Sequence, residues 1–278
     1  MYSLAEEFTG KVVIVTGGSK GIGRGCAEAF CDVGATVVIC GRNRAEGEKT
    51  ASELTEKNAG TCVFYPCNVG VESEVASLVD FTVGRFGRLD CIVNNAGYYP
   101  PEKPIEDVTE QDAQEIFRVN FFGVFFGCKH AVPHLRKTGG SIVNISSVES
   151  VMGMESAYCY TATKGAIDTF TRSLAIDEIR HGVRVNAVRP GNILTDMFYS
   201  NLSREPDPKE FVDYSDHVQW AGRGGKPSEI GSAVLFLASS MASFVVGTTL
   251  LVTGGYEIGE AAKYHRMPWN TGDAGTNE

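Results

Sequence analysis

The chain has 278 residues, of which 43% are hydrophobic and 21% charged, an ordinary globular composition with enough residues for a sizeable core. Its net charge of -9 and its lack of a Lys/Arg block argue against a nucleic-acid or anionic-membrane partner, because clustered cations lead phosphate binding. The start, MYSLAEEFTGK, has no signal-peptide pattern, and no apolar run approaches the roughly 18 residues of a membrane span. We therefore expect a soluble, cytoplasmic protein.

Seven short runs rich in Val and Ile alternate with helix-length segments. The predicted strands are VVIVT (12–16), TVVIC (36–40), TCVFY (61–65), CIVNN (91–95), SIVNIS (141–146), VRVNAV (183–188) and TLLVT (249–253). Segments between them, such as 45–58 and 112–137, carry helix patterns. Continuous apolar strands that alternate with helices predict an α/β fold, a doubly wound Rossmann-fold domain with a seven-stranded parallel sheet and helices on both faces.

No linker or internal repeat divides the chain, so we expect residues 1–278 to form a single domain. Residues 192–225 are an insertion before a last helix that should begin near Pro227. At the carboxyl ends of parallel strands such an insertion is suited to act as a lid over a substrate. We expect the tail, about 257–278, to be loose or to contact a partner subunit.

The cysteines and histidines do not indicate a metal site or a disulfide framework. None of the eight cysteines forms a CxxC pair and most lie in apolar runs, so we expect reduced core thiols. His130 and His134 have helical i, i+4 spacing, but no glutamate follows His130 as in HExxH. We therefore expect no metal.

A glycine-rich turn, TGGSKGIGRG (16–25), directly follows the first predicted strand and opens the first long helix. Gly17, Gly21 and Gly23 allow a tight turn and a close approach of a pyrophosphate to the positive end of that helix. Such a glycine pattern is weak evidence alone. Its position in a βαβ unit predicts a dinucleotide site.

The sequence YTATK (160–164) places Tyr160 and Lys164 on one face of a helix. A phenol with an ordinary pKa of about 10 is a poor base at neutral pH, and a nearby ammonium favours its anion. The pair can therefore serve as an acid/base catalyst. Taken alone, a surface Tyr/Lys pair would explain the same spacing.

Together, TGGSKGIG (16–23), NNAG (94–97), a serine thirteen residues before Tyr160, YTATK and RPGNILT (189–195) resemble the short-chain dehydrogenase/reductase family over roughly residues 8–256. The resemblance implies an NAD(P)(H)-dependent oxidoreductase that interconverts a secondary alcohol and a ketone by hydride transfer. In this family the protein handles the proton and the cofactor the hydride.

The resemblance also implies roles for four predicted catalytic residues. Tyr160 would be the general acid/base, Lys164 would lower its pKa and hold the nicotinamide ribose, and Ser147 would bind the substrate oxygen. Asn120 would hold a water in the proton relay. Simpler readings stay open, in which Ser147 caps a turn, Asn120 is a helix-bending buried amide and Thr195 is a helix N-cap.

The resemblance further implies a set of dinucleotide contacts along the strand ends, with an adenosine side after NNAG and a carboxamide contact after RPGN. The predicted cofactor-binding residues are Gly17, Ser19, Lys20, Gly21, Ile22, Gly23, Gly41, Arg42, Asn68, Val69, Asn94, Ala96, Gly97, Tyr160, Lys164, Pro190, Gly191, Ile193 and Thr195.

Gly41 stands where family members that prefer NAD usually carry an acid for the ribose 2′-hydroxyl. Arg42 offers a planar fork suited to a 2′-phosphate, and Lys20 resembles a second cation of NADP-preferring members. These residues favour NADP(H). NAD(H) is the alternative, if Arg42 is a solvated loop residue and NAD binds through the ribose hydroxyls and Asn68.

Within the family, FGRLDCIVNNAG (86–97), YYPP (98–101) and LLVTGG (250–255) are most similar to the type 14 17β-hydroxysteroid dehydrogenase subgroup, which is also linked to L-fucose oxidation. That subgroup carries an acid at Gly41 and histidines at Tyr98 and Tyr99. We expect a steroid-like hydroxylated ring as substrate, with an L-fucose-type sugar or a general carbonyl compound as alternatives. A low-turnover dinucleotide-sensing or scaffold protein is the alternative of another class.

The candidate substrate residues flank the catalytic motifs or lie in the insertion, and most are aromatic or polar, which suits a hydroxylated ring. They are Tyr98, Tyr99, Ser147, Glu149, Met154, Tyr160, Asn192, Phe198, Tyr199 and Trp220. Equally, the lid aromatics could pack against the domain or a partner subunit. The resemblance implies a homotetramer, formed through long helices that begin near residues 110 and 157.

Overall fold

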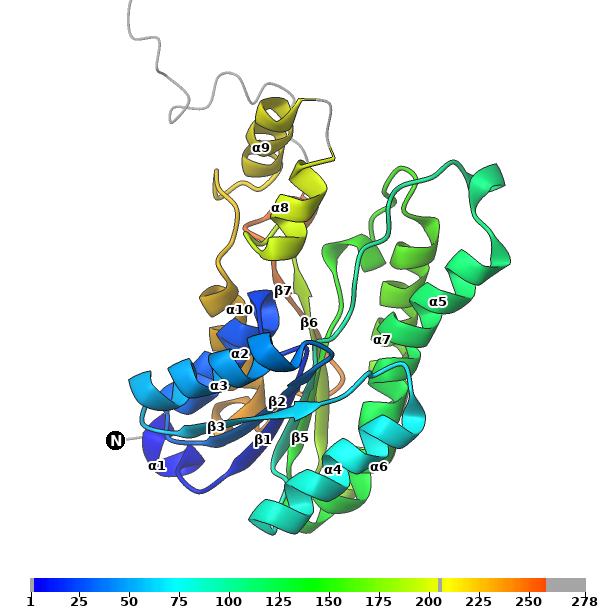
Figure 1. The fold of residues 1–278 in the computed structure, drawn as a ribbon. Helices are drawn as coiled ribbons and strands as arrows, with labels where there is room; N and C mark the ends of the chain where they lie inside the picture. Colours follow the sequence, from blue (N-terminus) through cyan, green and yellow to red (C-terminus); the bar gives the residue numbers. More distant parts are fainter. Residues whose placement is uncertain (1–2, 205–206, 259–278) are drawn as a thin grey trace, which may run out of the picture.

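The computed structural model describes residues 3–204 and 207–258 of the chain, and one parallel sheet runs through them (Figure 1). Its strand order is β3-β2-β1-β4-β5-β6-β7. The strands are β1 (Val12–Thr16), β2 (Thr36–Gly41), β3 (Thr61–Pro66), β4 (Cys91–Asn94), β5 (Ser141–Ile145), β6 (Arg184–Pro190) and β7 (Thr249–Val252). The predicted fold class and all seven predicted strands are confirmed, with small differences at the strand ends.

Helices cover both faces of this sheet (Figure 1). They are α1 (Leu4–Phe8), α2 (Gly21–Asp32), α3 (Arg44–Lys57), α4 (Glu72–Phe86), α5 (Glu110–Asn120), α6 (Phe122–Thr138), α7 (Tyr158–Glu178), α8 (Asp196–Leu202), α9 (Pro208–His217) and α10 (Pro227–Ala238). The last of these begins at Pro227, as the sequence predicts.

Alternate side chains of each strand feed two separate core layers. In β1, Val13 and Val15 join the layer beneath α2 and α10, whereas Ile14 joins the layer beneath α4, α6 and α7. Burial on both faces explains why the strands read as continuous apolar runs. Seven of the eight cysteines are buried in these layers, as expected of core residues.

The helix pattern of residues 112–137 is confirmed, but it forms two helices, because the chain breaks at Phe121 between α5 and α6. Asn120, the last residue of α5, turns its buried amide to the segment after β4. It accepts a hydrogen bond from the Tyr98 N–H (3.0 Å) and donates one to the Tyr98 carbonyl (2.9 Å). The apolar periodicity continues through the break, so the sequence pattern could not reveal it.

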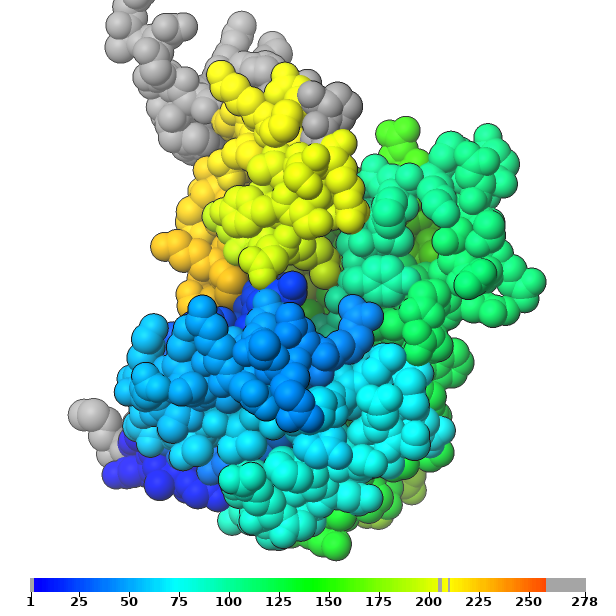
Figure 2. All heavy atoms as spheres, viewed as in Figure 1, coloured from blue at the N-terminus to red at the C-terminus, as the bar shows by residue number. Residues whose placement is uncertain are grey.

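The insertion at residues 192–225 carries α8 and α9 beyond the carboxyl ends of β6 and β7 (Figure 1). Its two ends are joined by a parallel bridge between Ile193 and Gly225, with the Leu194 N–H donating to the Gly225 carbonyl at 2.9 Å. The surface is hollowed where the insertion, the start of α2 and the segment after β4 meet (Figure 2). This hollow lies above the strand ends that carry the predicted motifs.

Further expectations concern the tail, a membrane span and a metal site. Most of the predicted tail, 257–278, lies outside the described residues. Along the described part of the chain no helix has the length and apolarity to cross a membrane. Within the same residues no group of three or more metal-binding side chains gathers, and the His130 ring nitrogen Nε2 lies 3.2 Å from Glu72 Oε1.

Candidate active site

The sheet order places a crevice at the carboxyl ends of β1 and β4, where the chain winds outward in opposite directions. Thr16, at the end of β1, ties the two strand ends together. Its hydroxyl oxygen accepts hydrogen bonds from the backbone N–H groups of Asn95 (2.9 Å) and Ala96 (3.0 Å). The Asn95 amide in turn donates to the Thr16 carbonyl at 2.8 Å. These bonds fix the NNAG segment beside the glycine-rich turn.

The glycine-rich turn fits a dinucleotide. Gly17 and Gly21 have φ angles of +64° and +53°, and a Cβ at Gly23 would lie 2.2 Å from the Gly17 carbonyl oxygen. The N-cap of α2, Lys20, makes no side-chain capping bond, so the first turn of the helix keeps N–H groups for an anion. A nicotinamide dinucleotide bound there supplies hydride transfer.

The predicted adenosine side of the crevice carries both positively and negatively charged side chains. Arg42 is exposed and makes no hydrogen bond or ion pair with the described residues. Lys20, the predicted second cation, lies 3.9 Å from the Asp196 carboxylate of α8. Sequence reasoning missed Glu46, whose carboxylate accepts a hydrogen bond from the Ser19 hydroxyl at 3.4 Å. A carboxylate therefore stands beside the glycine-rich turn although Gly41 carries none.

Two predicted adenosine contacts use their side chains elsewhere. The buried Asn94 amide donates to Asn144 Oδ1 at 2.9 Å, inside the layer between sheet and helices. Its predicted cofactor contact is therefore left to its backbone. Asn68 accepts a hydrogen bond from the Gly70 N–H at 3.1 Å, and Val69 is buried in the core.

Three of the four predicted catalytic residues come together at the ends of β5 and α7. The Lys164 ammonium is buried, donates to the Ile145 carbonyl at 3.0 Å and lies 5.5 Å from the centroid of the Tyr160 ring. The Ser147 hydroxyl oxygen accepts a hydrogen bond from the Glu149 N–H at 3.2 Å and also bonds to Tyr160. Ser147 thus caps a turn and contacts Tyr160 at once. Asn120 reaches the site through the Tyr98 backbone.

Burial and a neighbouring acid set the protonation of this cluster. Burial raises the pKa of Tyr160, and the Glu149 carboxylate raises it further, while the bond to Ser147 lowers it. Lys164 is not among the groups that shift this pKa, although the resemblance implies that Lys164 lowers it. Burial also lowers the pKa of Lys164 to about 8, opposed by the carboxylates of Glu149 and Asp168.

On the substrate side of Tyr160 lies Tyr99, with the two ring centroids 4.7 Å apart. The Tyr99 hydroxyl donates to Glu102 Oε1 at 3.1 Å. Burial raises the pKa of Tyr99, and the carboxylates of Glu149 and Glu102 add to the rise. Sequence reasoning included Tyr99 and Glu149 but missed Glu102, whose only signal is its place three residues after Tyr99.

The lid aromatics are held within the insertion or against the domain. Phe198 is buried, with ring centroids 5.5 Å from both Phe211 and Tyr199. Trp220 lies against the turn after β7, where a Cβ added to Gly255 would be 3.1 Å from the Trp220 Cβ. These contacts agree with the packing alternative for the lid. Met154 is half-buried in the loop before α7.

Residues of the RPGNILT segment are held by the insertion. Thr195 caps α8 by accepting a hydrogen bond from the Phe198 N–H at 3.3 Å, as the N-cap reading expected. It also faces the glycine-rich turn, since a Cβ at Gly21 would lie 3.3 Å from its Cγ2. Asn192 has its N–H bound by the buried Gln219 side chain at 2.8 Å.

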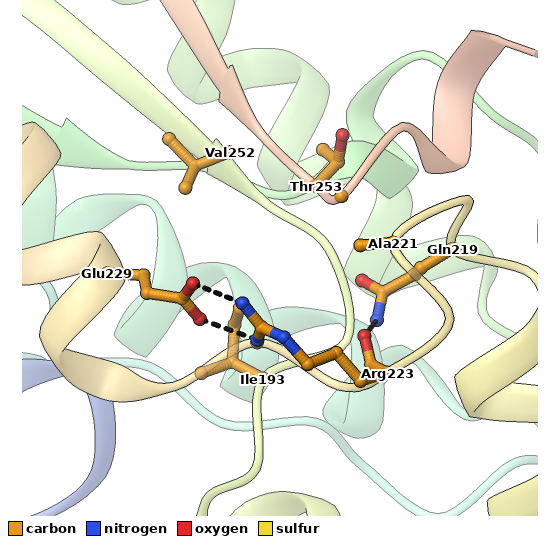
Figure 3. Close-up of a pocket in the computed structure, with 9 residues that line it drawn as sticks. Ile193, Gln219, Ala221, Arg223, Glu229, Val252 and Thr253 are labelled. Atoms are coloured by element: carbon orange, nitrogen blue, oxygen red, sulfur yellow. Dashed lines mark hydrogen bonds and ion pairs between the residues drawn. The ribbon is translucent and has the colours of Figure 1, made fainter.

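Gln219 also borders a small pocket between the insertion and β7 (Figure 3). Its amide donates to the Arg223 carbonyl at 2.9 Å, and Arg223 forms a double ion pair with Glu229 at 2.6 and 2.9 Å. None of the four predicted catalytic residues lines this pocket. Gln219, which sequence reasoning missed, therefore positions the Gly191–Asn192 backbone from behind.

The packing of Phe198 gives a first test. Its side chain is 9% exposed, so Phe198→Ala should cost about 3 kcal/mol of the insertion's stability and lower Tm more than it changes KM. Tyr199→Ala is the matched control. The Tyr199 side chain is next to Phe198 but is 54% exposed, so its removal should leave Tm nearly unchanged. A large KM increase with unchanged Tm for Phe198→Ala would place Phe198 in the substrate pocket instead.

Known proteins resemble this chain over most of its length. The family model described as "Enoyl-(Acyl carrier protein) reductase" matches residues 17–257. The L-fucose dehydrogenase of Bos taurus is 45% identical over 261 residues, covering 94% of each chain. The "Glucose and ribitol dehydrogenase homolog" of Oryza sativa subsp. japonica is 37% identical over 269 residues, covering 91% of this chain and 88% of that protein.

Solved structures share the fold. Levodione reductase matches with a TM-score of 0.86 and 31% identity, over 89% of this chain and 98% of that chain. The aldohexose dehydrogenase of Thermoplasma acidophilum matches with a TM-score of 0.83 and 34% identity, over 92% of this chain and 96% of that chain. The crevice, the cluster around Tyr160 and these matches agree with the family expected from the motifs. The chain belongs to the short-chain dehydrogenase/reductase family.

Proposed function

We propose that this oxidoreductase oxidises a free sugar of the L-fucose type at its hemiacetal hydroxyl. The observation that carries the proposal is the assembled Ser147–Tyr160–Lys164 cluster beside a dinucleotide crevice, in a chain 45% identical to an L-fucose dehydrogenase. The sequence motifs favoured a steroid-like ring and the type 14 subgroup. The names of the relatives instead support the sugar alternative.

The residues of the cluster divide the proton chemistry. Ser147 holds the substrate oxygen by a hydrogen bond, and Tyr160 accepts the hydroxyl proton as the C=O bond forms. Lys164 supplies a buried positive charge that stabilises the tyrosinate and holds the ribose of the dinucleotide. Asn120 would hold a water through which the proton leaves the site. In this proposal the insertion at 192–225 closes over the substrate.

The substrate proposal is tested with purified protein and a panel of L-fucose, other aldoses, a 17β-hydroxysteroid and a simple secondary alcohol, each with NAD⁺ and NADP⁺. We expect kcat/KM for L-fucose to exceed that for the steroid by at least about tenfold, or about 1.4 kcal/mol in barrier height. A steroid preference of the same size would overturn the sugar proposal. Binding of dinucleotide without turnover on the whole panel would indicate a sensing or scaffold protein.

We also propose that NADP(H) is preferred to NAD(H). The support is Arg42, next to Gly41 at the end of β2, which is exposed and interacts electrostatically with Glu115 but forms no close ion pair with a described residue. Two acids temper this support, because Glu46 lies at Ser19 and Asp196 lies near Lys20. The outcome depends on whether Arg42 or Glu46 faces the ribose 2′ position.

Titration of the protein with NADPH and NADH, followed by nucleotide fluorescence, tests the preference. We expect NADPH to bind at least about tenfold more tightly, and Arg42→Ala to abolish that margin. Arg44→Ala is the control, because Arg44 is also exposed but pairs with Glu48 at 3.1 Å. Equal or tighter NADH binding would contradict the proposal. Glu46→Gln would then be expected to weaken NADH binding.

We propose, finally, that the enzyme is a homotetramer joined through α5, α6 and α7. The support is a cluster of aromatic rings across these helices, in which Phe122 and Phe125 are exposed and Phe125 lies 5.9 Å from Phe170. Light scattering of the purified protein should give four times the mass of the 29.9 kDa chain. A monomer that keeps full activity would contradict this assembly.

A further inference from the structure

Glu149 has a buried carboxylate oxygen to which no described residue donates a hydrogen bond. It lies in the 3-10 helix Val148–Ser150, two residues after Ser147, and its N–H donates to the Ser147 hydroxyl oxygen at 3.2 Å. This bond ties the position of Glu149 to that of the predicted substrate-binding serine. Its Oε2 atom is buried and has no hydrogen-bond partner among the described residues.

The groups around Glu149 come from three separate elements. Its carboxylate interacts electrostatically with Tyr160 and Lys164 of α7 and with Tyr99 of the segment after β4. Burial raises the pKa of Glu149 to about 7; Lys164 opposes this rise, and Glu102, from the same segment as Tyr99, adds to it. The acid thus lies within electrostatic reach of both tyrosines of the Tyr99–Tyr160 pair.

Its neighbours are already committed to other partners. The Tyr99 hydroxyl donates to Glu102, and the Lys164 ammonium donates to the Ile145 carbonyl. A buried carboxylate oxygen without a donor costs about 1–3 kcal/mol or more, because it has lost its water and gained nothing in exchange. A hydroxyl group of a substrate bound beside Ser147 and Tyr160 is one source of the missing donor.

We propose that Glu149 accepts a hydrogen bond from a second hydroxyl of the substrate, close to the reacting carbon, and so selects polyhydroxylated substrates over alcohols on an apolar ring. This inference rests on the proposed function and deepens it. A steroid or a cyclohexyl ring presents only C–H groups beside the reacting carbon, and would cover Oε2 without pairing it. A sugar or other vicinal diol brings the donor with it.

The Tyr99–Glu102 pair belongs to the same subsite as a support. Tyr99 lies against Tyr160, with the two ring centroids 4.7 Å apart, and is anchored at its hydroxyl by Glu102, so its ring forms a fixed wall beside the Tyr160 ring. The wall restricts the substrate to an orientation in which the reacting oxygen meets Tyr160. In that orientation Glu149 accepts the hydrogen bond from the second hydroxyl of the substrate.

The test compares two substrates that need only dehydrogenase activity, vicinal cyclohexanediol and cyclohexanol, in the wild type, Glu149→Gln and Glu149→Leu. The wild type should favour the diol in kcat/KM, and Glu149→Leu should reduce that preference at least about tenfold. Glu149→Gln keeps an amide oxygen as acceptor and should retain part of the preference. Glu155→Gln, an exposed acid in the same loop, should change nothing.

A second readout separates recognition from folding. In Tyr160→Phe, which is expected to bind without turnover, the diol should bind more tightly than cyclohexanol, and added Glu149→Leu should remove the difference at unchanged Tm. If the diol preference of the wild type survives Glu149→Leu, the inference is overturned. If diol selection follows Glu149 but no sugar is oxidised, the inference stands and the L-fucose proposal fails.

Discussion

Tyr160→Phe should lower kcat by about 10²- to 10⁴-fold while the protein still binds its dinucleotide. The substitution removes only the phenolic oxygen, which takes the substrate proton, and leaves the ring that packs 4.7 Å from Tyr99. The Lys164 ammonium keeps its bond to the Ile145 carbonyl, so the cluster should hold its shape. Steady-state rates and a fluorescence titration with NADPH and NADH measure the two properties.

Tyr158→Phe is the matched control for this substitution. Tyr158 lies on the same helix but is exposed, and position 162, one turn further on, is an alanine rather than a lysine. Removal of the Tyr158 hydroxyl should leave kcat within about twofold, because Tyr158 has no part in the proposed proton transfer. Substantial residual activity in Tyr160→Phe would remove the tyrosine from the proposed acid/base role.

Asp168→Leu should reduce the free energy of unfolding by about 3–5 kcal/mol, because it leaves a buried arginine without its counter-ion. Asp168 Oδ2 accepts hydrogen bonds from Arg189 Nε at 3.0 Å and from Nη2 at 2.7 Å. The two side chains are only 4% and 15% exposed, so water cannot replace the lost partner. Denaturation by urea, monitored by circular dichroism, measures the change.

The double variant Asp168→Leu with Arg189→Met separates charge from packing. Replacement of a whole buried ion pair by apolar side chains is often neutral, so most of the lost stability should return. Asp177→Ala, which breaks the exposed pair with Arg180, should leave stability within experimental error. If the double variant is as unstable as the single one, the loss came from packing and not from an unpaired charge.

Local patterns predicted the elements and the motifs, because their signals lie in neighbouring residues. The apolar run of β1 and the glycine-rich turn at Gly17 and Gly21 can each be recognised from a few consecutive residues. The helix break at Phe121 was suggested only by the possibility that Asn120 is a helix-bending amide, and the partner of that amide, the Tyr98 backbone 22 residues away, was not visible in the sequence. A periodic pattern carries no information about such a distant partner.

Of the site, the sequence predicted the residues that belong to motifs but not the residues that only the fold brings near them. Ser147, Tyr160 and Lys164 were found through their spacing, and the fold brought them together. Glu46, Glu102 and Gln219 were missed because each is an ordinary polar residue in an irregular or surface segment. Only the fold shows that Gln219 reaches Asn192 from 27 residues away.

The proposed reaction moves a proton from a sugar to Tyr160 and a hydride from the same sugar to the bound nicotinamide. Its most direct test uses L-fucose deuterated at C1, incubated with the protein and each oxidised dinucleotide, with the product nucleotide analysed by mass spectrometry. We expect deuterium in the reduced nicotinamide for the wild type and almost none for Tyr160→Phe in the same time. Unlabelled nucleotide from L-fucose, together with labelled nucleotide from a 17β-hydroxysteroid deuterated at its carbinol carbon, would contradict it.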